Sequence, residues 1–145
     1  FFFIIIMETI LHTEPGVFQL SHSNNILTLK IFENKFDDIT SQTLINNIDT
    51  FHKICENNNK KFYSLVDLTE CSLLNLPNYL YYAPMFTKYL NSQKHFLDKH
   101  LYGTLYIINN NTVKTILNNL ISNYNGSTPI HFILKNEDID FSFTT

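Results

Sequence analysis

Glycine and cysteine are scarce in this chain of 145 residues, and their scarcity excludes several kinds of site. The three glycines form none of the patterns GxGxxG, GxxxxGK(S/T) or GxSxG, so the common nucleotide sites and the hydrolase nucleophile turn are disfavoured. The two cysteines, Cys55 and Cys71, form neither a CxxC pair nor a disulfide framework. We therefore expect two buried free thiols in a reducing compartment, and a cytoplasmic protein.

A basic excess is also missing, because ten lysines and arginines stand against thirteen acidic residues, for a net charge of −3. Affinity for a phosphate backbone depends on such an excess, so we expect no nucleic-acid partner. The histidines lack HExxH or HxH spacing, and we expect neither a metal site nor a cofactor. These histidines are His12, His22, His52, His95, His100 and His131. With no catalytic motif found, the sequence predicts a protein that is not an enzyme.

The apolar run of residues 1–7 is interrupted by Glu8, well short of the roughly 20 residues that a membrane-spanning helix needs. It has no basic n-region and no small-residue cleavage site. We expect Met7 to be the true start, with residues 1–6 as upstream translation or the stub of a longer chain. A fragment of a membrane anchor is the alternative. Residues 1–12 are thus assigned to an apolar leader or disordered N-terminus, and residues 13–145 to one domain.

Strand and helix patterns alternate along the first half of that domain. Two β-rich runs, residues 16–21 and 26–33, predict a hairpin in which the second strand has one clearly apolar face. Asp37, Asp38 or Thr40 can cap a helix that ends near residue 57.

The run of residues 61–69 is apolar on both sides, which predicts a central strand with helices on both faces of the sheet. Asn75 can cap the next helix, and Pro84 should kink or split it about two turns in. A second helical piece should then run to about Lys99.

A further strand, helix and strand are predicted over residues 101–108, 113–124 and 130–134, and residues 136–145 form a short tail. The order is β-β-α-β-α-β-α-β. It predicts a single α/β domain with a mixed, mostly parallel sheet of about five strands, an N-terminal hairpin and helices packed on the sheet.

Charged side chains gather at the predicted carboxyl ends of the strands. Asp67 ends the central strand, Asp37 and Asp38 follow the second strand, and Lys135 ends the last. This set is similar in residue types to a response-regulator receiver, in which carboxylates hold Mg²⁺ and one accepts a phosphoryl group. The simpler interpretation is that the aspartates cap a helix and bind loop amides.

Four segments together resemble the STAS and SpoIIAA-like superfamily: ILTLKIFENKFDDITSQTLINNI, FYSLVDLTECSLLNLPNYL, LYGTLYIINNNTVKTILNNLISNY and PIHFILKNEDIDF. The resemblance spans residues 17–143. It implies a non-enzymatic regulatory module that binds a partner protein, and in some members a phosphorylated serine opens the helix after the central strand. The nearest hydroxyls here are those of Ser72 and Thr69, beside Asp67, and these three form a weak candidate phosphorylation site.

Aromatic side chains crowd the helix that this superfamily uses to contact partners, at Tyr79, Tyr81, Tyr82, Phe86 and Tyr89. Neighbouring residues lie about 100° apart on a helix, so these rings cannot all face one core. We expect some of them to be exposed and to bind the partner protein. Two alternatives stay open: the rings roof the core, or the helix covers an apolar pocket for a lipid-like ligand.

Overall fold

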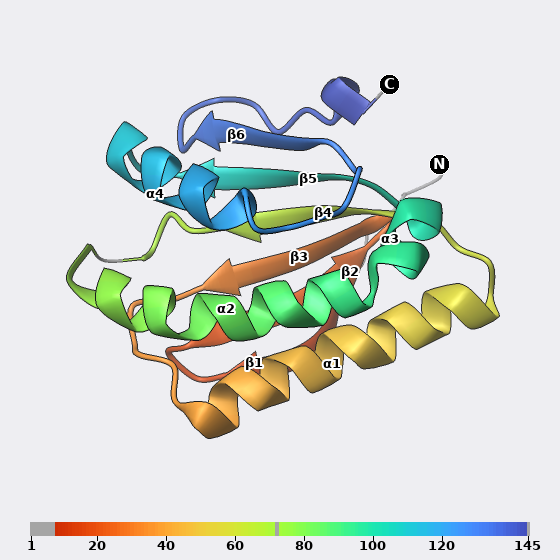
Figure 1. Cartoon of the computed structure of the whole chain (residues 1–145), viewed down its shortest axis with the longest axis horizontal. Helices are drawn as coiled ribbons and strands as arrows, with labels where there is room; N and C mark the ends of the chain where they lie inside the picture. Colours follow the sequence, from red (N-terminus) through yellow and green to blue (C-terminus); the bar gives the residue numbers. More distant parts are fainter. Residues whose placement is uncertain (1–7, 72, 145) are drawn as a thin grey trace, which may run out of the picture.

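A computed structural model describes residues 8–71 and 73–144 (Figure 1). The elements are β1 (Thr9–Glu14), β2 (Phe18–Ser23), β3 (Ile26–Ile31), α1 (Asp38–Asn57), β4 (Phe62–Asp67), the 3₁₀ turn η1 (Leu73–Asn75), α2 (Leu76–Ser92), α3 (Lys94–His100), β5 (Leu101–Ile108), α4 (Asn111–Ile121), β6 (Ile130–Leu134) and the 3₁₀ turn η2 (Ser142–Thr144).

The six strands form one sheet in chain order, from β1 to β6. β1, β2 and β3 pair antiparallel, and β3, β4, β5 and β6 pair parallel. The predicted α/β class and the mixed, mostly parallel sheet are confirmed, with six strands in place of about five. β4 is interior, as predicted, because it pairs in parallel with β3 on one side and β5 on the other.

The hairpin and the first helix follow their local sequence signals. β2 and β3 meet at a turn in which Asn24 has a φ of 54°, a left-handed angle that asparagine tolerates. Asp37 then caps α1: its carboxylate accepts the Thr40 amide at 2.7 Å, and the Thr40 hydroxyl accepts the Asp37 amide at 2.8 Å. This reciprocal capping box fixes where α1 begins.

The N-terminal boundary differs from the prediction, because residues 9–12 belong to β1 instead of a leader. β1 pairs with β2 and carries a bulge between Ile10 and His12. Its residues mix exposed and half-buried side chains without a clean alternation, so no strand pattern was recognisable there. The expectations for residues 1–7 lie outside the described residues. Among the helices that are described, none combines the length and apolar character needed to cross a membrane.

Pro84 does not split the helix, which was one of the two predicted effects, since α2 continues through this residue to Ser92. Pro84 is exposed, so its ring lies on the solvent side of the helix. Proline has no N–H to donate to the carbonyl one turn earlier, and on this side water can bind that carbonyl instead. The break comes at Gln93, which separates α2 from α3, and α3 ends at His100, close to the predicted end at residue 99.

The prediction of helices on both faces of the sheet is also wrong. Parallel strands in sequential order, joined by right-handed crossovers, place every connecting helix on the same face. Figure 1 shows α1, α2, α3 and α4 together in front of the sheet. The second face instead has a core of its own, with Phe141 and Phe143 of the C-terminal tail packed against four buried aliphatic side chains: Leu65, Leu105, Ile107 and Ile133.

Candidate functional site

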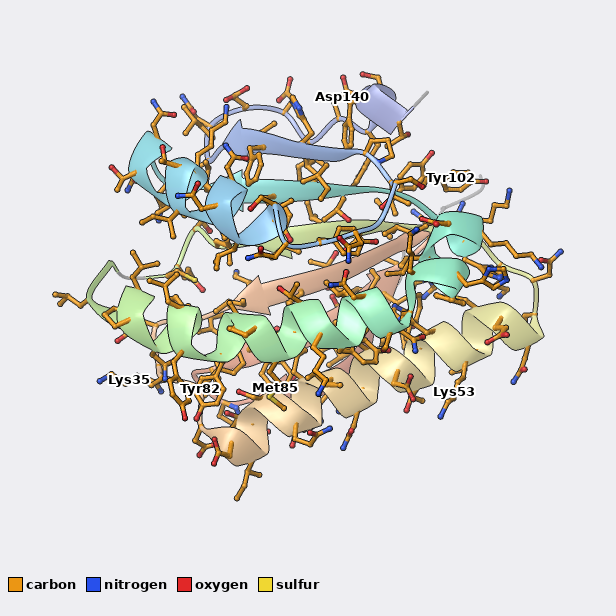
Figure 2. The ribbon with its side chains drawn as sticks, in the orientation of Figure 1. Lys35, Lys53, Tyr82, Met85, Tyr102 and Asp140 are labelled. Carbon is orange, nitrogen blue, oxygen red and sulfur yellow. The ribbon has the colours of Figure 1, made fainter. Side chains whose placement is uncertain are left out.

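Of the five aromatic residues predicted to bind a partner, four are half-buried and Tyr81 is exposed, so some of the rings are exposed as expected. The Tyr79 hydroxyl donates to the Phe32 carbonyl at 3.0 Å, and the Tyr82 hydroxyl donates to the Asp38 carboxylate at 2.9 Å. Figure 2 shows Tyr82 on the side of α2 that faces α1. The ring of Phe86 packs edge-on against Phe36, with centroids 6.1 Å apart.

Tyr81 is the clear exception among the five predicted partner-binding residues, because 74% of its surface is exposed. The remaining tyrosine, Tyr89, is half-buried and forms a network with α1. Its hydroxyl lies 3.1 Å from the Asp49 carboxylate and 3.0 Å from Nδ1 of His52. Since the carboxylate only accepts, the Tyr89 proton goes to Asp49, and Nδ1 of His52 donates to the phenol oxygen.

His52, the histidine of this network, has a pKa well below its ordinary value. It is 3% exposed and stacks against Tyr89 and Phe96, with ring centroids 5.9 and 4.6 Å away. Burial lowers the pKa of His52 from 6.5 to about 4, although a hydrogen bond with Gln93 and the charge of Asp49 act in the other direction. The imidazole is therefore neutral in the folded protein at neutral pH.

This burial predicts a pH-dependent loss of stability. Below about pH 6.5 the unfolded chain binds a proton at His52 that the folded chain does not, so the free energy of unfolding falls as the pH drops toward about 4. At about pH 5 this one group should lower it by about 2 kcal/mol relative to neutral pH. Urea unfolding of the wild type and of His52→Gln measures the effect. Parallel pH profiles for the two proteins would contradict it.

The weak phosphorylation candidates form an ordinary loop in the described residues. Oδ1 of Asp67 accepts both the amide and the hydroxyl of Thr69, at 2.9 and 2.7 Å. Ser72 lies outside the described residues. Asp37 caps α1, and Asp38 accepts the Tyr82 hydroxyl. In residues 8–71 and 73–144, no three His, Cys, Asp or Glu side chains are placed to hold a metal ion.

The most distinctive feature of the helix-covered face is a cavity of about 290 Å³ between α2, α4 and the sheet. α2 contributes Leu76, Tyr79, Leu80, Ala83, Phe86 and Leu90 to its wall. α4 contributes Val113, Ile116, Leu117, Leu120 and Ile121. None of the residues of α2 or α4 is fully buried, although both helices turn apolar side chains inward. Their apolar faces are thus held apart from each other instead of packing together.

The floor of the cavity carries the hydroxyl groups of Ser64 and Thr104, which are opposite each other on the neighbouring strands β4 and β5. Tyr106 lies two residues further along β5 and also lines the cavity. Burial, together with the nearby Tyr124 phenol, raises the pKa of Tyr106 to about 12. The Tyr124 hydroxyl is buried close to the Thr128 hydroxyl, and burial raises the pKa of Tyr124. Polar groups are therefore concentrated at one part of an otherwise apolar wall.

Sequence reasoning missed these floor residues. The helix over residues 113–124 was predicted without any role in a cavity, and Ser64 and Thr104 were not singled out. A signal was present in β4, where Ser64 takes a helix-facing position between Phe62 and Val66. A hydroxyl at an alternating position of a central strand, otherwise apolar on that side, indicates something other than close packing.

Side-chain hydrogen bonds hold the segment after α4 against α2 and α3. The Asn91 side chain donates to the Asn123 carbonyl at 3.2 Å and accepts the Asn125 amide at 2.9 Å. Asp98 accepts the amide and the hydroxyl of Ser127, at 3.3 and 2.9 Å. These contacts join the segment after α4 to α2 and α3.

Comparison of the chain with protein-family models, with curated proteins and with solved structures gives no match. The resemblance to the STAS and SpoIIAA-like superfamily therefore stays a prediction. It depends on the quoted segments and on the order of their strands and helices.

Proposed function

We propose that this chain is a non-enzymatic binding protein that holds a mainly apolar small molecule in the cavity between α2, α4 and the sheet. The observation that carries the proposal is the cavity itself. Its volume of about 290 Å³ lies near the lower end of the range for small-molecule sites, about 300–1,000 Å³, and its walls are chiefly aliphatic and aromatic. It corresponds to the predicted alternative in which the helix from Tyr79 to Tyr89 covers an apolar pocket for a lipid-like ligand.

The energetics of packing support a ligand over an empty core. Protein interiors are close-packed, and the lining of this cavity is mainly apolar. Leaving that lining uncovered forgoes about 25 cal/mol for each Å² of apolar surface that a ligand would remove from water. An apolar ligand would restore the missing contacts and stabilise the folded chain by mass action.

Binding of phenylnaphthylamine, an uncharged apolar fluorophore, tests this function. We expect saturable fluorescence enhancement at one site per chain, together with a higher melting temperature at saturating probe. A probe signal that rises linearly with protein concentration and leaves the melting temperature unchanged would contradict a defined cavity.

Binding of a partner protein by a STAS-like module is the second candidate function, and one observation favours it. Tyr81 is 74% exposed on α2 and has the exposed Leu80 beside it in sequence, at 39%. Exposed tyrosine is effective at interfaces because it is large and rigid, with an apolar ring and a polar end. The supporting surface is smaller than the five residues predicted from the sequence, since the other four are engaged with the protein itself.

A further inference from the structure

We propose that the cavity selects uncharged ligands that carry a hydroxyl or carbonyl group, bound by the hydroxyls of Ser64 and Thr104. This inference rests on the proposed function and adds the chemical class of the ligand. Three features of the described residues lead to it: the charge of the lining, the arrangement of the two hydroxyls, and the cavity volume.

The lining contains no ionised side chain. In the described part of the chain, no Lys, Arg, Asp or Glu lines the cavity, and its one histidine, His52, is buried and neutral. A carboxylate or ammonium group placed there would lose its hydration without meeting an opposite charge, at an effective cost of several kcal/mol. The cavity therefore discriminates against fatty acids in their ionised form and against alkylamines.

The hydroxyl pair provides the polar contact. Ser64 and Thr104 are directly paired across β4 and β5, whose backbones lie about 4.8 Å apart as in any sheet, so one ligand oxygen can reach both hydroxyls. Neither hydroxyl has a hydrogen-bond partner within the described residues. Each can donate or accept, which suits an alcohol or a carbonyl. A pure hydrocarbon would cover both groups without replacing their hydrogen bonds to water.

Size completes the description of the ligand class. A volume of about 290 Å³ lies just below the usual range for small-molecule sites, about 300–1,000 Å³, so the cavity can take a small molecule of roughly ten to twenty non-hydrogen atoms. A medium-chain alcohol has this size, with an apolar chain for the wall formed by α2 and α4 and one oxygen for the floor.

Competition against bound phenylnaphthylamine tests the inference with three probes of equal chain length: decanol, decanoate and decylamine, at neutral pH. We expect decanol to bind at least about tenfold more tightly than either charged probe. Equal competition by decanoate or decylamine, or no competition by decanol while phenylnaphthylamine still binds, would overturn the inference but leave the proposed function intact. Absence of phenylnaphthylamine binding would instead count against the function itself.

The near-isosteric double variant Ser64→Ala with Thr104→Val tests the assigned contact. It removes both hydroxyls with little change in volume, so decanol affinity should fall about tenfold while phenylnaphthylamine affinity stays within about twofold. The double variant Ser21→Ala with Thr28→Val is the control, because these residues are paired across β2 and β3 but lie outside the cavity lining. Unchanged decanol affinity in the first variant, with its fold verified by circular dichroism, would refute the role of the pair.

Discussion

Replacing Ala83 by phenylalanine should abolish ligand binding without unfolding the protein. Ala83 lies on α2, is half-buried and lines the cavity, so the added ring enters the space that a ligand would occupy. We expect phenylnaphthylamine affinity to fall more than about tenfold. Stability should remain equal or rise, because the ring gains contacts in a void where ordinary overpacking strain is small. Fluorescence titration and thermal unfolding measure the two effects.

Two further variants make this result specific. Leu117→Phe fills the cavity from the opposite wall, on α4, and should reproduce the loss of binding. Tyr81→Ala changes an exposed residue of the same helix as Ala83 and should leave probe affinity unchanged. If both filling variants bind the probe as the wild type does, the cavity is not the binding site. A protein partner whose capture is weakened by Tyr81→Ala would support the second candidate function.

The second large effect concerns the opposite face of the sheet. Changing Phe141 and Phe143 together to serine should lower the free energy of unfolding by about 3 kcal/mol, since each ring covers buried aliphatic side chains of β4, β5 and β6. The urea midpoint should shift to lower concentration. The double variant would also expose an apolar patch that promotes association.

Ile139→Ser is the matched control for this change, because Ile139 belongs to the same tail but is 54% exposed. Its substitution should shift the midpoint little. The tail variants should still bind phenylnaphthylamine when folded, because the cavity lies on the other face of the sheet. If the double phenylalanine variant unfolded at the same midpoint as Ile139→Ser, the tail would contribute nothing to the second core.

Local signals predicted the elements that depend on neighbouring residues. The alternation of Leu27, Leu29 and Ile31 set the apolar face of β3, and these three residues line the helix-covered side. Asp37, one of three predicted capping candidates, begins α1, and the helix predicted from residue 113 begins at Asn111, where the Asn110 side chain accepts the Val113 amide at 3.0 Å. Strand alternation and helix capping depend only on residues that are close together in the chain, so periodicity and capping chemistry are enough to predict them.

Features that depend on distant parts of the chain were not predictable in the same way. The pattern of residues 61–69 showed that both faces of β4 are apolar but not that a tail, instead of a helix, covers one of them. The cavity depends on the separation of α2 and α4, two helices that are joined through α3 and β5 and that both line it. Amphipathic stripes specify which sides of two helices turn inward, but not how closely the helices approach.

The loose packing between α2 and α4 also affects how the protein responds to hydrostatic pressure. Unfolding eliminates internal voids, so the unfolded chain with its solvent occupies less volume than the folded chain does. The part of the cavity that water does not fill adds to that difference, and compression therefore favours unfolding. A molecule bound in the cavity fills this space. The contacts that bind the molecule therefore also make the folded protein less compressible.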